Sequence, residues 1–449
     1  MTMKQILTQT EWATKILGVQ KEQKGPLRLS CHVLRVPCPQ GELWYHNMTG
    51  EMLLFGPEER PEEYRDELAR RWYLVAEDSD EYTLAMQLRR IAEMMARKTD
   101  ALTKFVVFPT TDCNARCFYC YEMGRSRQHM SDTVAADTAE FILRRSKGHK
   151  IELQWFGGEP LYHRRAIDII SHRLREQGAE YQSIMVSNGY LFDEGTVRAA
   201  VEDWHLDFVQ IALDGCEATY NRTKAYIHHD GNAFERVMHN ISLLLDAGIK
   251  VCVRMNMNLE NADELWRLSD QLKDRFGAKS GFTAYTVLLR DFHHGAQRFG
   301  DEMKSLRRYE ALQKKLIADG LGKLQYTRRE IPTNQCMADN DRSVTILPDG
   351  RVGKCEHESE ERLIGTIYDE TFDQTAVSAW KERIVIPECR ECLFAPTCIR
   401  LKQCAWHAEG CTESNRTEMR MNLTQKVLNT YGRECVQGEK TLAEGEDSL

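Results

Sequence analysis

The chain has 449 residues, of which 42% are hydrophobic and 29% are charged, a balance typical of a folded protein with two or three domains. Its net charge of −8 is spread along the sequence, which excludes a basic nucleic-acid groove and predicts no nucleic-acid partner. The first 25 residues lack the pattern of a signal peptide, and no run is apolar enough to span a bilayer. We therefore expect a cytoplasmic protein with no membrane partner.

Residues 1–98 are predicted to form an N-terminal α+β unit. Within them, residues 32–37 and 42–47 carry strand patterns on either side of a turn. Residues 61–71 predict a helix, and residues 72–81 predict a further strand that ends in acidic side chains.

Residues 99–300 show strands alternating with helices. The predicted strands cover residues 105–108, 151–156, 183–186, 208–213, 251–257 and 282–288. One predicted helix buries a stripe from Phe234 to Leu245, and another opens with Asn261-x-x-Glu264, a capping-box pattern. Six such units predict an α/β fold, a partial (β/α)6 barrel resembling a TIM barrel. Ligands of such sheets bind at the carboxyl ends of the strands.

Fifteen cysteines in a protein expected to be cytoplasmic indicate metal or redox chemistry instead of disulfides. Three lie between residues 113 and 120, and seven lie between residues 336 and 411. The other five are expected to be small buried hydrophobes or incidental thiols: Cys31, Cys38, Cys216, Cys252 and Cys435.

The last third of the chain changes character. Residues 301–335 are predicted to be a connecting helical segment. Apolar periodicity fades in residues 336–415, so we expect this segment to depend on bound metal for much of its stability. Residues 416–449 predict a helix and an acidic tail.

Cys113, Cys117 and Cys120 directly follow the first predicted barrel strand, so they lie on a loop at its carboxyl end. Three thiolates on one loop can ligate three irons of a [4Fe–4S] cluster and leave the fourth iron open. A zinc site is the alternative, but it lacks a fourth nearby ligand. The CxxxCxxC spacing resembles the signature of radical S-adenosylmethionine (SAM) enzymes, in which the amino and carboxylate groups of SAM bind the open iron.

Further motifs extend this resemblance along successive strand ends. Gly157-Gly158-Glu159-Pro160 is similar to the family's GGEP motif, in which the glycines allow the backbone to approach SAM and the carboxylate accepts from its ammonium. The resemblance also implies SAM contacts at Tyr119, Ser187, Asn188 and Arg254. For Asp214 and Asn256, ligand contact and local packing remain equal alternatives.

The C-terminal cysteines resemble the SPASM domain, an extension that holds two auxiliary iron–sulfur clusters. The resemblance assigns Cys336, Cys355 and Cys404 to the first auxiliary cluster. It assigns Cys389, Cys392, Cys398 and Cys411 to the second. With the SAM-binding cluster, this predicts three [4Fe–4S] clusters.

Two points in the SPASM assignment stay open. Five residues separate Cys398 from Cys404, where the family usually has three, so the sequence departs from the family pattern at Cys404. The first auxiliary cluster lacks a fourth cysteine, so either Cys435 completes it or one iron stays open for a peptide thiolate. A zinc ribbon is the alternative for the whole segment.

The family resemblance implies that one electron from a reductant such as flavodoxin or ferredoxin cleaves SAM to a 5′-deoxyadenosyl radical, which abstracts hydrogen from the substrate. The sequence is most similar to maturases that crosslink ribosomally made peptides, usually through a thioether, as in sactipeptides and ranthipeptides. The N-terminal unit is loosely similar to domains that bind a leader peptide as an added strand. The predicted partner is therefore a precursor peptide with its leader.

Three alternative functions remain at this point. An anaerobic sulfatase-maturing enzyme would share both cluster regions but usually has Asp after the cysteine where Glu356 follows Cys355. A maturase forming carbon–carbon or ether links has the same motifs. A non-enzymatic iron–sulfur or zinc-binding module would not need the strand-end motifs. No catalytic base is assigned, because Glu356 and His357 also fit a solvated turn.

Overall fold

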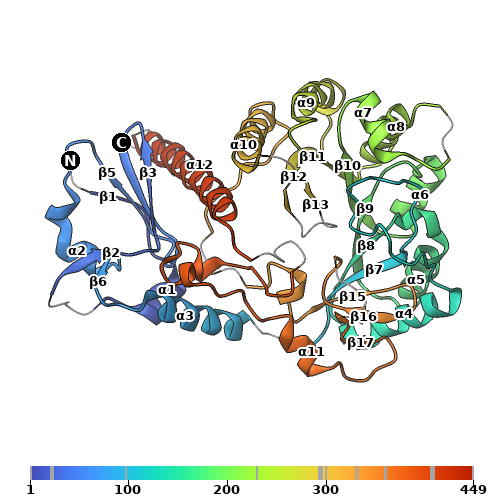
Figure 1. Ribbon diagram of the computed structural model, residues 1–449, viewed down its shortest axis with the longest axis horizontal. Coiled ribbons are helices and arrows are strands. Elements are labelled where there is room, and N and C mark those ends of the chain that lie inside the picture. The colour runs from blue at the N-terminus through green and yellow to red at the C-terminus, as the bar shows by residue number, and fades with distance from the viewer. Residues whose placement is uncertain are drawn as a thin grey trace.

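The computed structural model describes residues 3–20, 25–96, 99–228, 231–291, 297–298, 301–328, 331, 333–357, 362–404 and 410–446. Its largest element is a nine-stranded sheet with the order β12-β11-β10-β9-β8-β7-β15-β16-β17. Figure 1 shows this curved sheet flanked by helices on one side of the molecule and the N-terminal unit on the other. Within the described ranges, no helix combines the length and apolarity that crossing a bilayer requires.

Six neighbouring strands of this sheet are parallel, and each of the first five is followed by one or two helices. The strands are β7 (Lys104–Thr110), β8 (Ile151–Gly157), β9 (Tyr181–Ser187), β10 (Leu206–Leu213), β11 (Lys250–Met257) and β12 (Phe282–Leu288). The helices are α4 (Asp132–Ser146), α5 (Arg164–Glu176), α6 (Glu194–Glu202), α7 (Glu217–Lys224), α8 (Ala233–Asp246) and α9 (Ala262–Phe276). This arrangement confirms the predicted α/β fold and partial barrel.

The sequence pattern explains most of these elements. Strand β9 alternates buried and less buried residues, as a strand with one face on the core does. Helix α8 begins at the Asn232 cap, whose side chain accepts from the amides of Phe234 and Glu235, and it buries the predicted apolar stripe.

The predicted capping box at Asn261 is wrong, although α9 begins where the pattern placed it. The Asn261 side chain makes no capping bond to the helix. Its amide instead donates to the backbone carbonyls of Asp214 at 2.9 Å and Asn256 at 2.8 Å. Contacts between two strand ends have therefore replaced the local cap, which a local pattern does not reveal.

The cysteine-rich segment joins the barrel sheet through strands that its sequence did not predict. β15 (Ser343–Ile346) pairs in parallel with β7, and β16 (Arg351–Gly353) and β17 (Gly365–Thr366) extend the edge antiparallel. All four residues of β15 are buried. The remaining elements here are β13 (Arg290–Asp291), β14 (Gln297–Arg298), α10 (Glu302–Ala318), α11 (Gln374–Ala379) and α12 (Glu413–Glu446).

The N-terminal unit is built on an antiparallel sheet with the order β1-β5-β4-β3. These strands are β1 (Lys4–Leu7), β3 (Val33–Cys38), β4 (Gly41–His46) and β5 (Met52–Phe55), and the predicted strand pair corresponds to β3 and β4. A second pair joins β2 (Leu27–Leu29) to β6 (Leu74–Ala76), and the helices are α1 (Glu11–Leu17), α2 (Arg65–Arg70) and α3 (Glu81–Ala96). Pro37 lies in the edge strand β3, where its missing N–H is tolerated. Helix α12 packs against β3 (Figure 1).

Arg89 of α3 joins the N-terminal unit to the cysteine-rich segment. Its side chain is 3% exposed and donates to the carbonyl oxygen of Cys398 at 2.7 Å. It also pairs with the buried carboxylate of Asp339 at 3.3 Å and with Glu93 at 2.9 Å. One buried guanidinium therefore satisfies groups from both regions.

Replacing Arg89 should weaken the contact between these two regions and so lower the free energy of unfolding. We expect Arg89→Met to lower the free energy of unfolding by about 3 kcal/mol or more, because Asp339 keeps a buried charge with one partner fewer. Arg90→Met, at an exposed position on the same helix, is the matched control and should change it little. Urea unfolding measures both, and equal stability of the two variants would contradict the role of Arg89.

Candidate active site and metal centres

Cys113, Cys117 and Cys120 lie on one loop directly after β7 and are all partly buried. The Ala115 amide donates to the Cys113 sulfur at 3.3 Å, and the Cys120 amide donates to the Cys117 carbonyl at 3.1 Å. Burial raises the pKa of the Cys120 thiol to about 11 and that of Cys113 to about 12. Burial therefore disfavours the thiolate form of these two groups, which a bound cation would stabilise.

Gly157 and Gly158 allow the end of β8 to lie against this loop. Gly157 has a φ of +115°, and a Cβ on it would lie 2.2 Å from the carbonyl oxygen of Thr110. A Cβ on Gly158 would lie 2.2 Å from the carbonyl oxygen of Asp112. Close backbone contact with the cysteine loop is thus a structural reason for both glycines, besides the predicted approach to SAM.

Glu159 forms hydrogen bonds with the residues at the end of β9. Its carboxylate is fully buried and accepts from the Ser187 hydroxyl at 2.9 Å, the Asn188 amide at 2.7 Å and the Leu161 amide at 3.2 Å. Burial raises the pKa of Glu159 to about 7, against the lowering effect of these donors. Pro160 follows as the buried first residue of a short 3₁₀ turn (Pro160–His163).

Asn188 connects this strand end to the cysteine loop. Its side-chain amide donates to the Asn114 side-chain oxygen at 2.7 Å and lies 3.8 Å from the Cys113 sulfur. The structure therefore brings the predicted residues Glu159, Ser187 and Asn188 together beside the first thiol.

Arg254 lies in β11, and its Nε is buried without a hydrogen-bond partner among the described residues. A buried guanidinium nitrogen without an acceptor is costly. An anionic group of a bound molecule would provide that acceptor.

Tyr119 meets Asp214 and Asn256 in a buried hydrogen-bond network. The Tyr119 hydroxyl donates to the Asp214 carboxylate at 2.8 Å and accepts from the Asn256 amide at 3.1 Å. The Asn256 amide also donates to Asp214 at 2.7 Å. Of the two alternatives left open for Asp214 and Asn256, the geometry favours local hydrogen bonding.

Cys336, Cys355 and Cys404 each pack against the barrel core. Burial raises the pKa of the Cys355 thiol, and the neighbouring charges of Glu356, Cys336 and Cys404 raise it further. The longer spacing before Cys404 therefore does not remove it from this group. Whether the three thiols ligate iron stays a prediction.

The other four cysteines line one cavity together with side chains of α3 and α12: Cys389, Cys392, Cys398 and Cys411. Arg383, Arg400 and Arg416 line the same cavity. A cation-rich cavity around four thiols has the charge that a thiolate-ligated iron–sulfur cluster requires.

Cys435 lies apart from the first auxiliary group. It packs in the apolar cluster of the N-terminal sheet with Cys38 and Tyr431, whereas Cys336 and Cys355 pack against the barrel core. Of the two ways to complete the first auxiliary group, the structure therefore disfavours Cys435.

Glu356 and His357 lie in a turn and are partly buried, not fully solvated. The His357 ring meets the Tyr121 ring edge-on, with centroids 4.3 Å apart, and Arg125 donates to the His357 carbonyl at 3.3 Å. Burial lowers the pKa of His357 to about 3, assisted by the charges of Arg254 and Arg125. Since Tyr121 directly follows Cys120, this contact links two cysteine loops.

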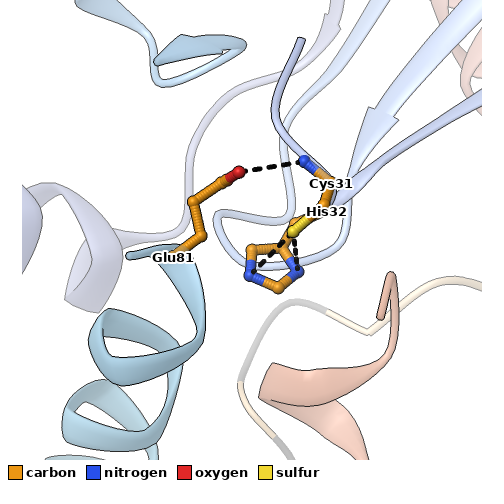
Figure 2. A group of neighbouring side chains, drawn as sticks. All are labelled: Cys31, His32 and Glu81. Atoms are coloured by element: carbon orange, nitrogen blue, oxygen red, sulfur yellow. Dashed lines mark hydrogen bonds between the residues drawn. The ribbon is translucent and has the colours of Figure 1, made fainter. Parts of the chain in front are cut away.

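Figure 2 shows Cys31, His32 and Glu81, whose ligand atoms lie within 4.8 Å of one another. The Glu81 carboxylate already accepts from Arg28 at 2.5 Å, from the Cys31 amide at 3.1 Å and from the Ser30 hydroxyl. Because these donors use the carboxylate and Arg28 balances its charge, we interpret the group as a hydrogen-bonded junction and not as a metal site.

Sequence reasoning missed Asn114 and Lys224. Asn114 lies inside the cysteine motif, where no rule assigns a role to the spacer residues. Lys224 follows Tyr119 by 105 positions in the sequence, but its Nζ lies 3.1 Å from the Tyr119 hydroxyl and 2.9 Å from the Asp214 carboxylate. Its position within a polar helix gave no signal of burial.

Glu159→Gln tests the hydrogen bonds that join Glu159, after β8, to Ser187 and Asn188 at the end of β9. Both carboxylate oxygens accept from backbone amides, so a glutamine must place its NH₂ group against one of these donors. We expect SAM affinity to fall at least tenfold, about 1.4 kcal/mol, as measured by calorimetry on iron-loaded protein. Glu152→Gln, exposed on the same strand, is the control, and unchanged affinity in Glu159→Gln would contradict the role.

Known proteins share parts of this architecture. A "Probable GTP 3′,8-cyclase" of Methanococcus maripaludis is 28% identical over 142 residues, which are 31% of this chain and 44% of that relative. The chain thus matches less than half of the relative's length.

Two solved structures with bound peptides share the fold. Native anSMEcpe with bound AdoMet and Cp18Cys peptide has a TM-score of 0.57 at 15% identity, covering 76% of this chain and 99% of that chain. Streptococcus suis SuiB bound to precursor peptide SuiA has a TM-score of 0.51 at 12% identity, covering 83% and 94%. At these identities the likeness shows the fold alone.

Residues 107–272 match the model of the radical SAM superfamily. This range begins in β7, ends in α9 and includes the loop with the first three thiols. Members of this superfamily bind SAM and a [4Fe–4S] cluster, and the cyclase above is named as an enzyme. The barrel region of this chain, residues 107–272, is therefore similar to the radical SAM superfamily.

Proposed function

We propose that this enzyme is a peptide maturase that installs a crosslink, most simply a thioether, in a ribosomally made precursor peptide. The observation that carries the proposal is the grouping of ten cysteines into three sets: one on the β7 loop and two in the segment that extends the barrel sheet. Peptides in the two solved structures of similar fold support a peptide substrate.

The β7 loop would hold the SAM-binding cluster through Cys113, Cys117 and Cys120. The fit rests on three thiols at the carboxyl end of a barrel strand and on the unpartnered Nε of Arg254. When bound, the cluster and SAM supply a 5′-deoxyadenosyl radical that abstracts hydrogen from carbon.

The chain's own residues would bind and orient SAM. Arg254 can donate from its buried Nε to an anionic group of SAM. The hydrogen bonds from Ser187 and Asn188 to Glu159 fix two strand ends beside Cys113. Tyr119 is held in place through its hydroxyl, which leaves its ring as a rigid surface. The proposed SAM contacts are Tyr119, Gly157, Gly158, Glu159, Pro160, Ser187, Asn188 and Arg254.

Thioether formation requires an electron acceptor. A peptide that gains a C–S bond loses one hydrogen from carbon and one from sulfur. One hydrogen leaves as an atom, and the other leaves as a proton and an electron. The two thiol groups of the cysteine-rich segment would hold auxiliary clusters, which would supply an acceptor for this electron. The first group has three cysteines, Cys336, Cys355 and Cys404, and so leaves room for a peptide thiolate.

The N-terminal unit would receive the leader of the peptide. Strand β3 is an edge of its sheet, and an extended peptide can pair with such an edge through backbone hydrogen bonds. Because Arg89 joins this unit to the Cys398 loop, a bound leader would be fixed relative to the second auxiliary group.

The test is the intact mass of a cysteine-bearing peptide encoded beside this gene, after anaerobic incubation with iron-loaded enzyme, SAM and dithionite. We expect the peptide to lose two hydrogens and one free thiol. Cys117→Ala should abolish the change, whereas Cys252→Ala, a single thiol in β11 outside all three groups, should retain it.

Other results would contradict the proposal. An unchanged peptide with continued formation of 5′-deoxyadenosine would reject this substrate. Peptides of sulfatases, the substrates of the alternative formylglycine-forming reaction, would then be tested. Loss of hydrogens with the thiol still free would reject the thioether.

A further inference from the structure

A cavity of about 240 Å³ lies where the N-terminal unit, the segment before the cysteine-rich region and helix α12 meet. Its lining includes Asn47, which follows β4, Thr327 of the connecting segment and Lys426 of α12. In Figure 1, α12 lies between the N-terminal unit and α10, and it contacts both β3 and α10. Three parts of the chain that are distant in the sequence therefore form this cavity.

Hydrogen bonds between these parts fix the walls of the cavity. The Asn47 side-chain amide donates to the Leu393 carbonyl at 2.9 Å and to the Thr397 hydroxyl at 3.0 Å. The backbone amide of Thr327 donates to the Thr430 hydroxyl of α12 at 2.9 Å. Because its walls are bonded to one another, the cavity is formed before a ligand binds, as ligand sites usually are.

The charge of the cavity is positive and unbalanced. Among its described lining residues, Lys426 and Arg328 are cationic and none is acidic. The side chains of Trp12, Tyr45 and Phe394 are part of the same lining and add an aromatic surface. A positive charge beside an apolar wall attracts an anion more strongly than it would in water. The combination fits a carboxylate carried on an apolar stem, as in an acidic amino-acid side chain.

Lys426 lacks an acidic partner on its own helix. The residues three and four positions away from it are Asn422, Leu423, Asn429 and Thr430. The lysine is half-buried. Burial lowers its pKa, the charge of Arg328 lowers it further, and no acidic side chain in the described part of the chain offsets these effects. Since a partly desolvated ammonium without a counter-ion is costly, a bound carboxylate would stabilise it.

The cavity adjoins the one lined by the second group of C-terminal cysteines. Phe394 and Met419 line both cavities. The same cavity also borders the N-terminal unit through Asn47 and Met48. A ligand held here would therefore contact the N-terminal unit and lie next to the second cysteine group at once.

We propose that this cavity binds an acidic side chain of the precursor peptide, with its carboxylate paired to Lys426 and assisted by the charge of Arg328. The proposal rests on the proposed function in taking a peptide as the ligand. The contact is non-covalent and would fix one point of the peptide between the N-terminal unit and α12.

The test is the dissociation constant of the cysteine-bearing peptide encoded beside this gene, labelled with fluorescein and measured by fluorescence anisotropy with the full-length, iron-loaded enzyme. Lys426→Met removes the charge, Lys426→Arg keeps it, and Arg328→Met removes the second cation at an exposed position. Arg420→Met, at an exposed position on the same helix and outside the cavity lining, is the matched control. A peptide series replaces each Asp or Glu by its amide, and one further peptide has an amidated C-terminus.

We expect Lys426→Met to raise the dissociation constant about tenfold or more, and Arg328→Met to raise it less. Lys426→Arg and Arg420→Met should match the unmodified enzyme. One peptide of the amide series should bind the unmodified enzyme as weakly as the original peptide binds Lys426→Met. Combining the two changes should weaken binding no further, because both remove the same contact.

An unchanged dissociation constant in Lys426→Met, or in Arg328→Met if the first variant does not fold, would overturn the proposal. Loss of the same contact only in the peptide with the amidated C-terminus would overturn it as well. A crosslinked peptide whose binding ignores Lys426 would reject the cavity and leave the proposed function standing. A peptide that binds through Lys426 but is never crosslinked would reject the proposed function and support the cavity, and a peptide that does not bind the unmodified enzyme would overturn both.

Discussion

The loop after β7 must hold three thiols in a fixed arrangement, yet it has few apolar side chains with which to pack. Its order comes instead from hydrogen bonds supplied by neighbouring strand ends. The Glu159 amide donates to the Asp112 carbonyl at 3.0 Å, the Asn188 side chain bonds to Asn114, and the Lys224 carbonyl accepts from Arg116. Each bond comes from a different strand–helix connection, so the barrel as a whole determines where the thiols lie. This dependence explains why the residues around the loop are polar and buried at once.

The second constraint is the connection of the cysteine-rich segment to the rest of the chain. β15 pairs with β7, the strand that carries the first three thiols, and His357 contacts Tyr121 at the other end of that loop. Arg89 and α12 then join the same segment to the N-terminal unit. The proposed metal centres and the proposed peptide-binding unit therefore share one hydrogen-bonded framework. A substitution that shifts one of these regions is therefore expected to alter the position of the others.

The fold was largely predictable because its signals are local. The six parallel strands have continuous apolar or alternating patterns, and the cysteine motif directly follows the first of them. β15 was missed because it has only four residues and is stabilised by pairing with β7, which lies far away in the sequence. The capping pattern at Asn261 failed for a related reason, since its side chain bonds to two distant strand ends. Lys224 was not predictable because a lysine in a polar helix usually faces solvent, and here the ion pair with Asp214 compensates its burial.

The candidate site was predictable in its residue types and less so in their contacts. The family resemblance assigned seven C-terminal thiols to two groups; in the structure three of them pack against the barrel core and the other four line one cavity, and their role as ligands stays a prediction. The glycines of the GGEP motif were expected to face SAM, but the structure shows that they also contact the cysteine loop. Spacing along a chain indicates which residues can meet, whereas the hydrogen bonds between strand ends depend on the sheet.

The central claim is that the β7 loop holds the group that cleaves SAM. The most direct measurement is the amount of 5′-deoxyadenosine formed by anaerobic, iron-loaded enzyme with SAM and dithionite, compared with a Cys113→Ala/Cys117→Ala/Cys120→Ala variant. The account predicts formation by the unmodified enzyme and none by the variant, even though the variant retains iron in its C-terminal cysteine groups. Absence of 5′-deoxyadenosine from fully loaded unmodified enzyme, or equal amounts from both proteins, would contradict it.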